Sequence, residues 1–562
     1  MFGSLASRLW FHALCGLSLM TCYPFQLLFS GNQNVYFLWG MAKAQVGSLA
    51  IDPLLAQTDP FPLFSLGVFG VLKFIHPIFF YALYWFVNSI YSFALFGIAN
   101  HLYNIYSKKN ELALFTAFFL LLHSGAIWAG SFRVMFGVDL SSVWDSGIAE
   151  QGVLRGYLQP STAGVFLVLS VYFFLKNVPS AAFTALSVAA IFHANYIVLD
   201  AGMGVSYLIL FFSDKKIKKT PLLIWGVVSV LMVLPQLWYI NQYFLPSSDF
   251  ETESMRQAVL QTKNGNMHLS PALWFNLRTL LQCLTISAAL WFYRKERIGK
   301  LLLSLVILFG SLTAATFIIG SSTLLSLTPW RISTVLMPIS SILIIGNLVV
   351  SKENFVLKNN IRQTLLVTGL ILLFSFAIYR VFGTQNPDFI FLWKFITFSC
   401  VVASISAIFL FKNFLKKSWI LSAVIALTIL STVTSGILEI KMEEIFRGQN
   451  ESSGVINYLH AHSRPTTLVL APLEFTTLRI NAGVAVVADN NLVHGLYLPQ
   501  LLKHQDTINH FYQKNYTKEQ ITTLQQKLGF NTIVAPIKKE IPTNLSIKEV
   551  YRDDNYKILT SN

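Results

Sequence analysis

The stretch Ala272–Phe317 reads ALWFNLRTLLQCLTISAALWFYRKERIGKLLLSLVILFGSLTAATF, two apolar runs separated by a short basic segment. Each run, at 271–292 and 300–319, is long enough to cross the hydrocarbon core of a bilayer, which takes about 20 apolar residues as a helix. The segment between them, RKERIGK, carries four Lys or Arg residues. This alternation predicts a helical protein that crosses a membrane repeatedly.

The composition of the whole chain points the same way. Of the 562 residues, 54% are apolar and only 12% are charged, and the mean hydropathy is +0.57. A soluble protein of this size could not bury so much apolar surface, so the bilayer must solvate most of it. The net charge of +15 lies in short clusters between apolar runs, without interleaved aromatics, which argues against a nucleic-acid partner. All four cysteines lie in apolar segments, so no disulfide framework or zinc site is indicated.

About thirteen apolar windows are long enough to span a membrane. They lie at 10–29, 79–104, 111–131, 161–176, 180–197, 198–213, 221–240, 271–292, 300–319, 332–350, 364–381, 389–411 and 418–438. We interpret the first window as a retained span rather than a cleaved signal peptide, because no A-x-A-like site follows it. The windows 180–197 and 198–213 predict either a hairpin or one long helix.

The charges of the connecting loops predict the orientation. With a cytoplasmic N-terminus, one set of loops carries about eighteen Lys and Arg and the other about eight, as the positive-inside rule requires. An odd number of spans then places the C-terminal region outside. The long and acidic loops 30–62, 132–160 and 241–270 fall on the outer side, where we expect function to reside.

The chain changes character near residue 441. The β-rich runs TTLVLAP, GVAVVAD, NTIVAPI and YKILT alternate with the amphipathic stretches LPQLLKHQDTINHFYQ and TKEQITTLQQKLGF. Strands that alternate with helices indicate a small α/β domain. We therefore predict a transmembrane domain over 1–440 and an outer α/β domain over 441–562.

The first outer loop offers two candidate carboxylates, Asp52 and Asp59. Each precedes a proline, and Asp-Pro commonly opens a turn, so both are turn residues in one interpretation. In the other, one of them lies at the head of the helical bundle as a base or a metal ligand. The intervening segment NVYFLWGMAKAQVGSLA is amphipathic enough to lie along the membrane interface.

The second outer loop contains Asp139, Asp145 and Glu150. These acids either keep the loop solvated or form part of a site. In a helix, Asp145 and Glu150 are five positions apart and do not share a face well. A metal ion bound by both therefore requires an irregular backbone, which Gly147 permits.

Five basic residues are candidates for binding a substrate. Arg133 and Arg155 flank the acids of the second outer loop, where they either form local salt bridges or bind phosphate. Arg278 lies inside an apolar span, so it must face a cavity or a partner. Arg331 opens a span and either extends to the headgroups or binds a lipid-linked phosphate. His193, also within a span, is either a packing residue or a site residue.

The order of these features resembles the GT-C superfamily, integral-membrane glycosyltransferases that use polyprenyl-phosphate-linked sugars, with a layout similar to the oligosaccharyltransferase catalytic subunit. The stretch VWDSGIAEQGVL looks like a loosened form of the acidic Asp-x-Glu-Gly-type motif of the family's second outer loop. The stretch LEFTTLRINAGVAVVADNN is similar to the segment that runs from a Trp-Trp-Asp-type motif to Asp-Asn-Asn. It carries Leu473, Glu474 and Phe475 in place of the motif that recognises a protein sequon, which speaks against protein N-glycosylation.

The resemblance implies transfer of a sugar from a polyprenyl-phosphate donor to a glycan, lipid or protein on the outer face. A carboxylate of the first two outer loops would deprotonate or orient the acceptor hydroxyl. Arg278, Arg331 or Arg155 would stabilise the departing phosphate. Mg²⁺ or Mn²⁺ would be held by Asp145, Glu150 and one acid of the first loop.

Two other functions are compatible with the same sequence. One is a transporter or flippase of a lipid-linked glycan, which would carry more charge through its spans and internal repeats. The other is a non-catalytic membrane subunit of a cell-envelope polysaccharide system, whose outer domain binds a partner. Short basic inner loops without long insertions favour a bacterial inner membrane as the location.

Overall fold

The structure is a computed structural model in which two compact units are distinguished. It describes residues 5–22, 28–29, 31–123, 143–154, 156–215, 217–243, 271, 274, 276–319, 322–350, 453–490, 499–542 and 547–561. The described residues of the first unit come from within 1–25, 81–237 and 265–441, and those of the second from within 26–80, 238–264 and 442–562. The domain boundary predicted at 440 and the last three predicted spans lie outside the described residues.

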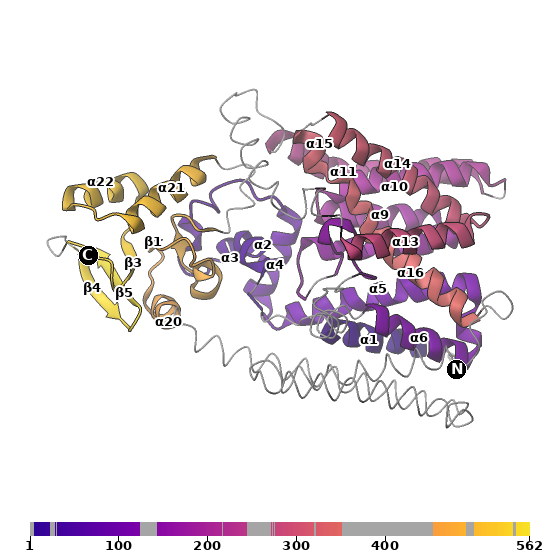
Figure 1. Ribbon diagram of the computed structural model, residues 1–562, viewed down its shortest axis with the longest axis horizontal. Helices are drawn as coiled ribbons and strands as arrows, with labels where there is room; N and C mark the ends of the chain where they lie inside the picture. The colour runs from indigo at the N-terminus through magenta and orange to yellow at the C-terminus, as the bar shows by residue number, and fades with distance from the viewer. Residues whose placement is uncertain are drawn as a thin grey trace. The chain divides into compact units, whose positions relative to one another are not determined.

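The first unit is helical (Figure 1). Its described elements are α1 (Leu5–Cys22), α5 (Phe79–Tyr103), η2 (Ile105–Ser107), α6 (Lys109–His123), η3 (Ile148–Glu150), η4 (Pro160–Gly164), α8 (Val165–Leu175), α9 (Pro179–Phe192), α10 (Tyr196–Ser213), α11 (Lys219–Tyr243), α13 (Leu277–Tyr293), α14 (Arg297–Ile319), α15 (Ser322–Leu327), η7 (Pro329–Ile332) and α16 (Ser333–Val350).

Among the described residues, five helical segments are long and apolar enough to cross a membrane. They are α5, α10, Lys219–Gln242 of α11, α14 and the continuous segment Pro329–Val350. The first unit also contains shorter apolar helices, including α9 and the segment Pro160–Leu175. The predicted helical, multi-span architecture is confirmed at this level, whereas the full number of about thirteen spans stays a prediction.

The region 180–213 forms two helices rather than one. Helix α9 ends at Phe192 and α10 begins at Tyr196. His193 between them has extended backbone angles (φ −141°, ψ 109°), which no helix continues through. The two helices pack against each other, so the hairpin alternative is correct.

Helix α16 lies at the centre of the first unit. Nearly all of its side chains are buried, and it packs against α6, α8 and α13. Helices α11 and α14 differ, because each exposes large apolar side chains such as Leu231 and Ile307. An exposed apolar face is what a helix needs in order to contact lipid.

The second unit joins the first loop region to the C-terminal region. Its described elements are α2 (Gln33–Tyr36), α3 (Leu38–Lys43), η1 (Leu49–Ile51), α4 (Pro62–Phe74), α20 (Ser453–His462), β1 (Leu468–Leu470), η9 (Leu478–Ala482), β2 (Ala485–Val486), α21 (Pro499–Gln513), α22 (Lys518–Leu528), β3 (Thr532–Pro536), β4 (Ile547–Arg552) and β5 (Tyr556–Ser561). The segment expected to lie along the membrane interface is divided among α2, α3 and η1, and most of α2 and α3 is buried.

The five strands form one mixed sheet in the order β2-β1-β3-β5-β4. Strand β1 pairs in parallel with β2 and β3, whereas β5 pairs antiparallel with β3 and β4. The four strands and two helices predicted for the α/β domain are all present, with α21 and α22 visible in gold in Figure 1. Strand β4 and helix α4 were not predicted.

Candidate functional site

The second outer loop is irregular over residues 143–154. Ser146 and Gly152 form an isolated antiparallel bridge, and the Gly147 amide donates to the Gln151 carbonyl at 2.7 Å. Between them lies the short 3-10 turn η3. The stretch that carries Asp145 and Glu150 is therefore a tight turn and not an α-helix.

Glycine is required at position 147 because the loop backbone lies close to Ser333 and Thr334, and not because the chain bends there. Its backbone is extended (φ −95°, ψ −177°), a conformation open to any residue. A Cβ at this position would lie 2.3 Å from Ser333 Oγ and 2.5 Å from Thr334 N, so only glycine fits. The chain reverses two residues later, where Ala149 and Glu150 take positive φ values of 62° and 55°. The chain bends as expected, but it does so at Ala149 and Glu150 and not at Gly147.

Four of the predicted residues meet where α13 and α16 begin. Arg278, in the first turn of α13, places Nη2 2.5 Å from Glu150 Oε1, and the Arg278 side chain is mostly buried. Arg331 in η7 contacts His193 Nε2 through Nη1 at 3.3 Å. Its guanidinium also lies 5.8 Å from the ring centroid of Tyr196. Because η3 packs against η7, both pairs belong to one end of the helical unit.

Asp145 is buried at the same loop, with 2% of its surface exposed. Tyr91 of α5 is also buried. The Tyr91 hydroxyl is hydrogen-bonded to His123 Nδ1 at 3.0 Å, and His123 Nε2 to Ser341 Oγ at 2.7 Å. Sequence reasoning missed Tyr91, His123 and Ser341, since single polar residues in apolar spans mostly serve packing.

Several buried polar atoms around the loop have no hydrogen-bond partner among the described residues. They are Gln151 Oε1, Arg278 Nε, Gln282 Oε1, Thr328 Oγ1 and Thr334 Oγ1. Buried polar groups in folded proteins are nearly always paired, so water or a ligand is expected to supply partners for these atoms. All five belong to the second outer loop or to the helix ends that it contacts.

The described residues do not fit a divalent metal ion. No group of three or more His, Cys, Asp or Glu residues within them is arranged to hold one. Glu150, one of the two predicted ligands, instead binds Arg278. Whether the protein binds Mg²⁺ or Mn²⁺ therefore stays a prediction. Arg133 and Arg155 lie outside the described residues.

In the second unit, Asp52 and Asp59 are turn residues. The Asp52 carboxylate accepts from the Leu54 amide at 2.8 Å, and that of Asp59 accepts from the Phe61 amide at 2.9 Å. An aspartate that accepts from the amide two residues on forms an Asx turn. Asp59 also pairs with Lys43 Nζ at 3.0 Å. The turn interpretation is what the structure shows, while a catalytic role for either stays a prediction.

Asp52 belongs to a buried ionic network with Arg479 and Asp489. Arg479 Nε lies 2.7 Å from Asp52 Oδ2, and Arg479 Nη1 lies 2.5 Å from Asp489 Oδ2. The third guanidinium nitrogen donates to the Val486 carbonyl at 2.7 Å, and all three side chains are almost fully buried. Burial alone would lower the pKa of Arg479, but the charges of Asp489 and Asp52 raise it above its usual value. The guanidinium is therefore firmly protonated.

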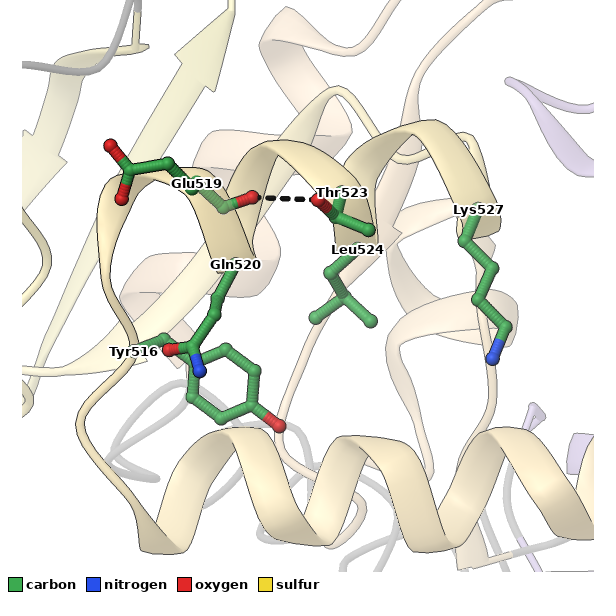
Figure 2. A pocket seen from close by; sticks show the side chains of 6 residues that line it. All are labelled: Tyr516, Glu519, Gln520, Thr523, Leu524 and Lys527. Atoms are coloured by element: carbon green, nitrogen blue, oxygen red, sulfur yellow. Dashed lines mark hydrogen bonds between the residues drawn. The ribbon is translucent and has the colours of Figure 1, made fainter.

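A hollow on the C-terminal sheet domain is less suited to chemistry. It lies along α22 and is lined by Tyr516, Glu519, Gln520, Thr523, Leu524 and Lys527. Figure 2 shows Gln520 close to the ring of Tyr516, with Glu519 and Lys527 at opposite ends of the helix. Its acid and its base thus lie two helical turns apart, and the hollow offers no acid–base pair.

Comparisons with known proteins give a likeness in structure only. No protein-family model matches the chain, and no curated protein sequence matches it. Two crystal structures of ArnT from Cupriavidus metallidurans align with 99% of this chain and 98% of their own. One is bound to undecaprenyl phosphate and is 12% identical; the other is in the apo state and is 13% identical; both have a TM-score of 0.46. Similarity at this level does not establish a shared activity.

Proposed function

We propose that the protein transfers a sugar from a polyprenyl-phosphate-linked donor to an acceptor on the outer face of a bacterial inner membrane. The observation that carries the proposal is the junction of the second outer loop with α13 and η7. There Arg278 pairs with Glu150 and Arg331 contacts His193, near buried polar atoms without partners among the described residues. The sequence resemblance to GT-C enzymes also supports a role for this loop in the reaction site.

The two arginines suit the leaving group. When the acceptor oxygen forms its bond to the sugar C1, the C1–O bond to the phosphate breaks and the lipid phosphate leaves with the bonding electrons. Negative charge on the phosphate therefore grows in the transition state, and fixed guanidinium donors stabilise it. Arg278 uses one nitrogen for Glu150 and keeps Nε without a partner among the described residues.

The carboxylates take different roles in this scheme. Asp145 is buried at the loop and would accept the proton of the acceptor hydroxyl as that oxygen attacks. Glu150 would orient Arg278 through its ion pair rather than act as a base. No step requires a metal ion, since the arginines neutralise the leaving phosphate.

A transfer assay tests the proposal. The purified protein in lipid nanodiscs is mixed with sugar-labelled undecaprenyl-phosphate monosaccharides and with membranes of a strain that lacks the protein as the acceptor. We expect label in the acceptor fraction, with kcat lower by about 10²–10⁴ for Asp145→Asn and by about 10²–10³ for Arg278→Gln. Arg552→Gln, at an exposed pair with Glu549 on the C-terminal sheet, is the matched control and should act like wild type.

Two results would overturn the proposal. The first is a wild-type protein that transfers no label from any donor in the panel. The second is full activity in both Asp145→Asn and Arg278→Gln. Movement of labelled lipid across the bilayer without transfer would support the flippase instead.

A further inference from the structure

One face of α13 holds both sides of the tight turn in the second outer loop. Arg278 and Gln282 are four positions apart, so their side chains project from the same side of the helix. Arg278 binds Glu150 at the end of η3. Gln282, which is completely buried, reaches Val143 and Ser146 on the N-terminal side of the turn. The two side chains thus contact the loop on either side of its tight turn.

Gln282 holds the backbone around Asp145. Its Nε2 donates to the Val143 carbonyl at 3.2 Å and to the Ser146 carbonyl at 3.0 Å, and it lies 3.4 Å from the Gly147 carbonyl oxygen. These carbonyls flank Asp145 on both sides. Three acceptors around one nitrogen also fix the orientation of the amide, because the carbonyl end would repel them.

The loop depends on such side-chain anchors because it has little regular structure of its own. Besides the bonds within its turn, it is held by Ser333 Oγ, which accepts from the Ile148 amide at 2.8 Å. Ala149 and Glu150 occupy the left-handed region, which residues other than glycine adopt only when their surroundings impose it. The backbone on both sides of Asp145 is thus held by contacts from α13 and α16.

We propose that Gln282 is a positioning residue that fixes Asp145 for proton transfer. The inference rests on the proposed sugar transfer and adds a residue that touches neither donor nor acceptor. A glutamine suits the task because it is long enough to reach the loop and carries donors without a buried charge. Arg278, one turn earlier on α13, holds the other side of the same tight turn through Glu150.

Two isosteric substitutions test this role. Gln282→Met keeps the length and removes the donors, and its apolar side chain is readily buried, so the fold is preserved. Gln282→Glu keeps the shape but turns an acceptor towards the loop carbonyls. Gln236→Met, at a buried glutamine of α11, is the control with the same chemical change.

Hydrogen exchange and kinetics are measured on the intact protein in nanodiscs. For both Gln282 variants we expect faster exchange in the peptide 143–154, with α16 and the C-terminal sheet unchanged. We also expect kcat to fall by about 10²-fold, the effect of misplacing a reacting group by about 1 Å, with the KM for the lipid-linked donor within about threefold of wild type. The control should match wild type in both measurements.

The outcomes separate this inference from the function on which it rests. Unchanged exchange in peptide 143–154 would show that Gln282 does not hold the loop. Faster exchange with an unchanged kcat would show that the loop is held but that its position does not matter for transfer. A wild type without transfer would remove the proposed function and the catalytic part of this inference, while exchange still decides whether Gln282 anchors the loop.

Discussion

The buried network around Arg479 gives the sharpest stability prediction. Replacing Arg479 by Met leaves Asp52 and Asp489 as two buried carboxylates without their shared counter-ion. Removing one partner of a buried ion pair costs about 3–5 kcal/mol, chiefly because the remaining charge stays desolvated. Among the described residues, Asp52 then keeps its bonds from the Leu54 and Val486 amides. We therefore expect Arg479→Met to destabilise the second unit by about 3–5 kcal/mol.

Hydrogen exchange measures this locally. The Ala485 amide donates to Ser48 Oγ at 2.8 Å and the Val486 amide to Asp52 Oδ2 at 2.8 Å, so both report directly on the network. A loss of about 3–5 kcal/mol raises their exchange rates by about two to three and a half powers of ten, at about 1.4 kcal/mol per tenfold. Arg552→Met, which breaks an exposed pair, should leave these rates unchanged.

Neutralising the whole network provides the second variant. In Arg479→Met with Asp52→Asn and Asp489→Asn, no buried charge remains, and such replacements are often neutral or stabilising. We expect most of the protection at Val486 to return. The reasoning fails if Arg479→Met exchanges within threefold of wild type, or if the triple variant is no more protected than the single one.

The remaining predictions use paired variants in the same way. Gly147→Ala forces a Cβ to within 2.5 Å of the Thr334 amide nitrogen and should speed exchange in peptide 143–154 and reduce transfer, whereas Gly310→Ala in open space should leave both unchanged. Thr517→Ala removes the capping box of α22 and should cost about 1 kcal/mol in thermal unfolding, because the helix N-terminus loses its side-chain partner; Thr522→Ala, within the exposed part of the same helix, should cost less.

The spans follow closely from the sequence where they are long and uniformly apolar. The predicted windows 79–104 and 300–319 match α5 and α14 to within a few residues, since length and hydropathy alone define a membrane span. Helix α4 was not predicted, because the same criteria of length and hydropathy select only segments long enough to span a membrane. Its 13 residues are apolar but too few to cross a bilayer, and its start at Pro62 gives only a weak signal.

The geometry of the second outer loop was beyond sequence reasoning. A glycine between two acids predicts a bend at the glycine, because glycine alone adopts the left-handed region freely. Here Ala149 and Glu150 occupy that region, whereas Gly147 has an extended backbone and lies close to Ser333. Contacts with helices more than a hundred residues away decide this arrangement, and no local pattern encodes them.

Asp52 likewise has a partner far away in the sequence that no local pattern reveals. This partner changes how a mutation of Asp52 must be interpreted. Its partner Arg479 is 427 residues away in sequence, so the pattern revealed only an Asp-Pro turn. Loss of function in Asp52→Ala would therefore not identify a catalytic base, since the same change removes one of the two carboxylates paired with the buried Arg479 and weakens the second unit. The triple neutral variant separates the two effects. If it folds as wild type and transfers sugar, Asp52 acts only through structure; if it folds and is inactive, at least one of the three replaced side chains takes part in the reaction.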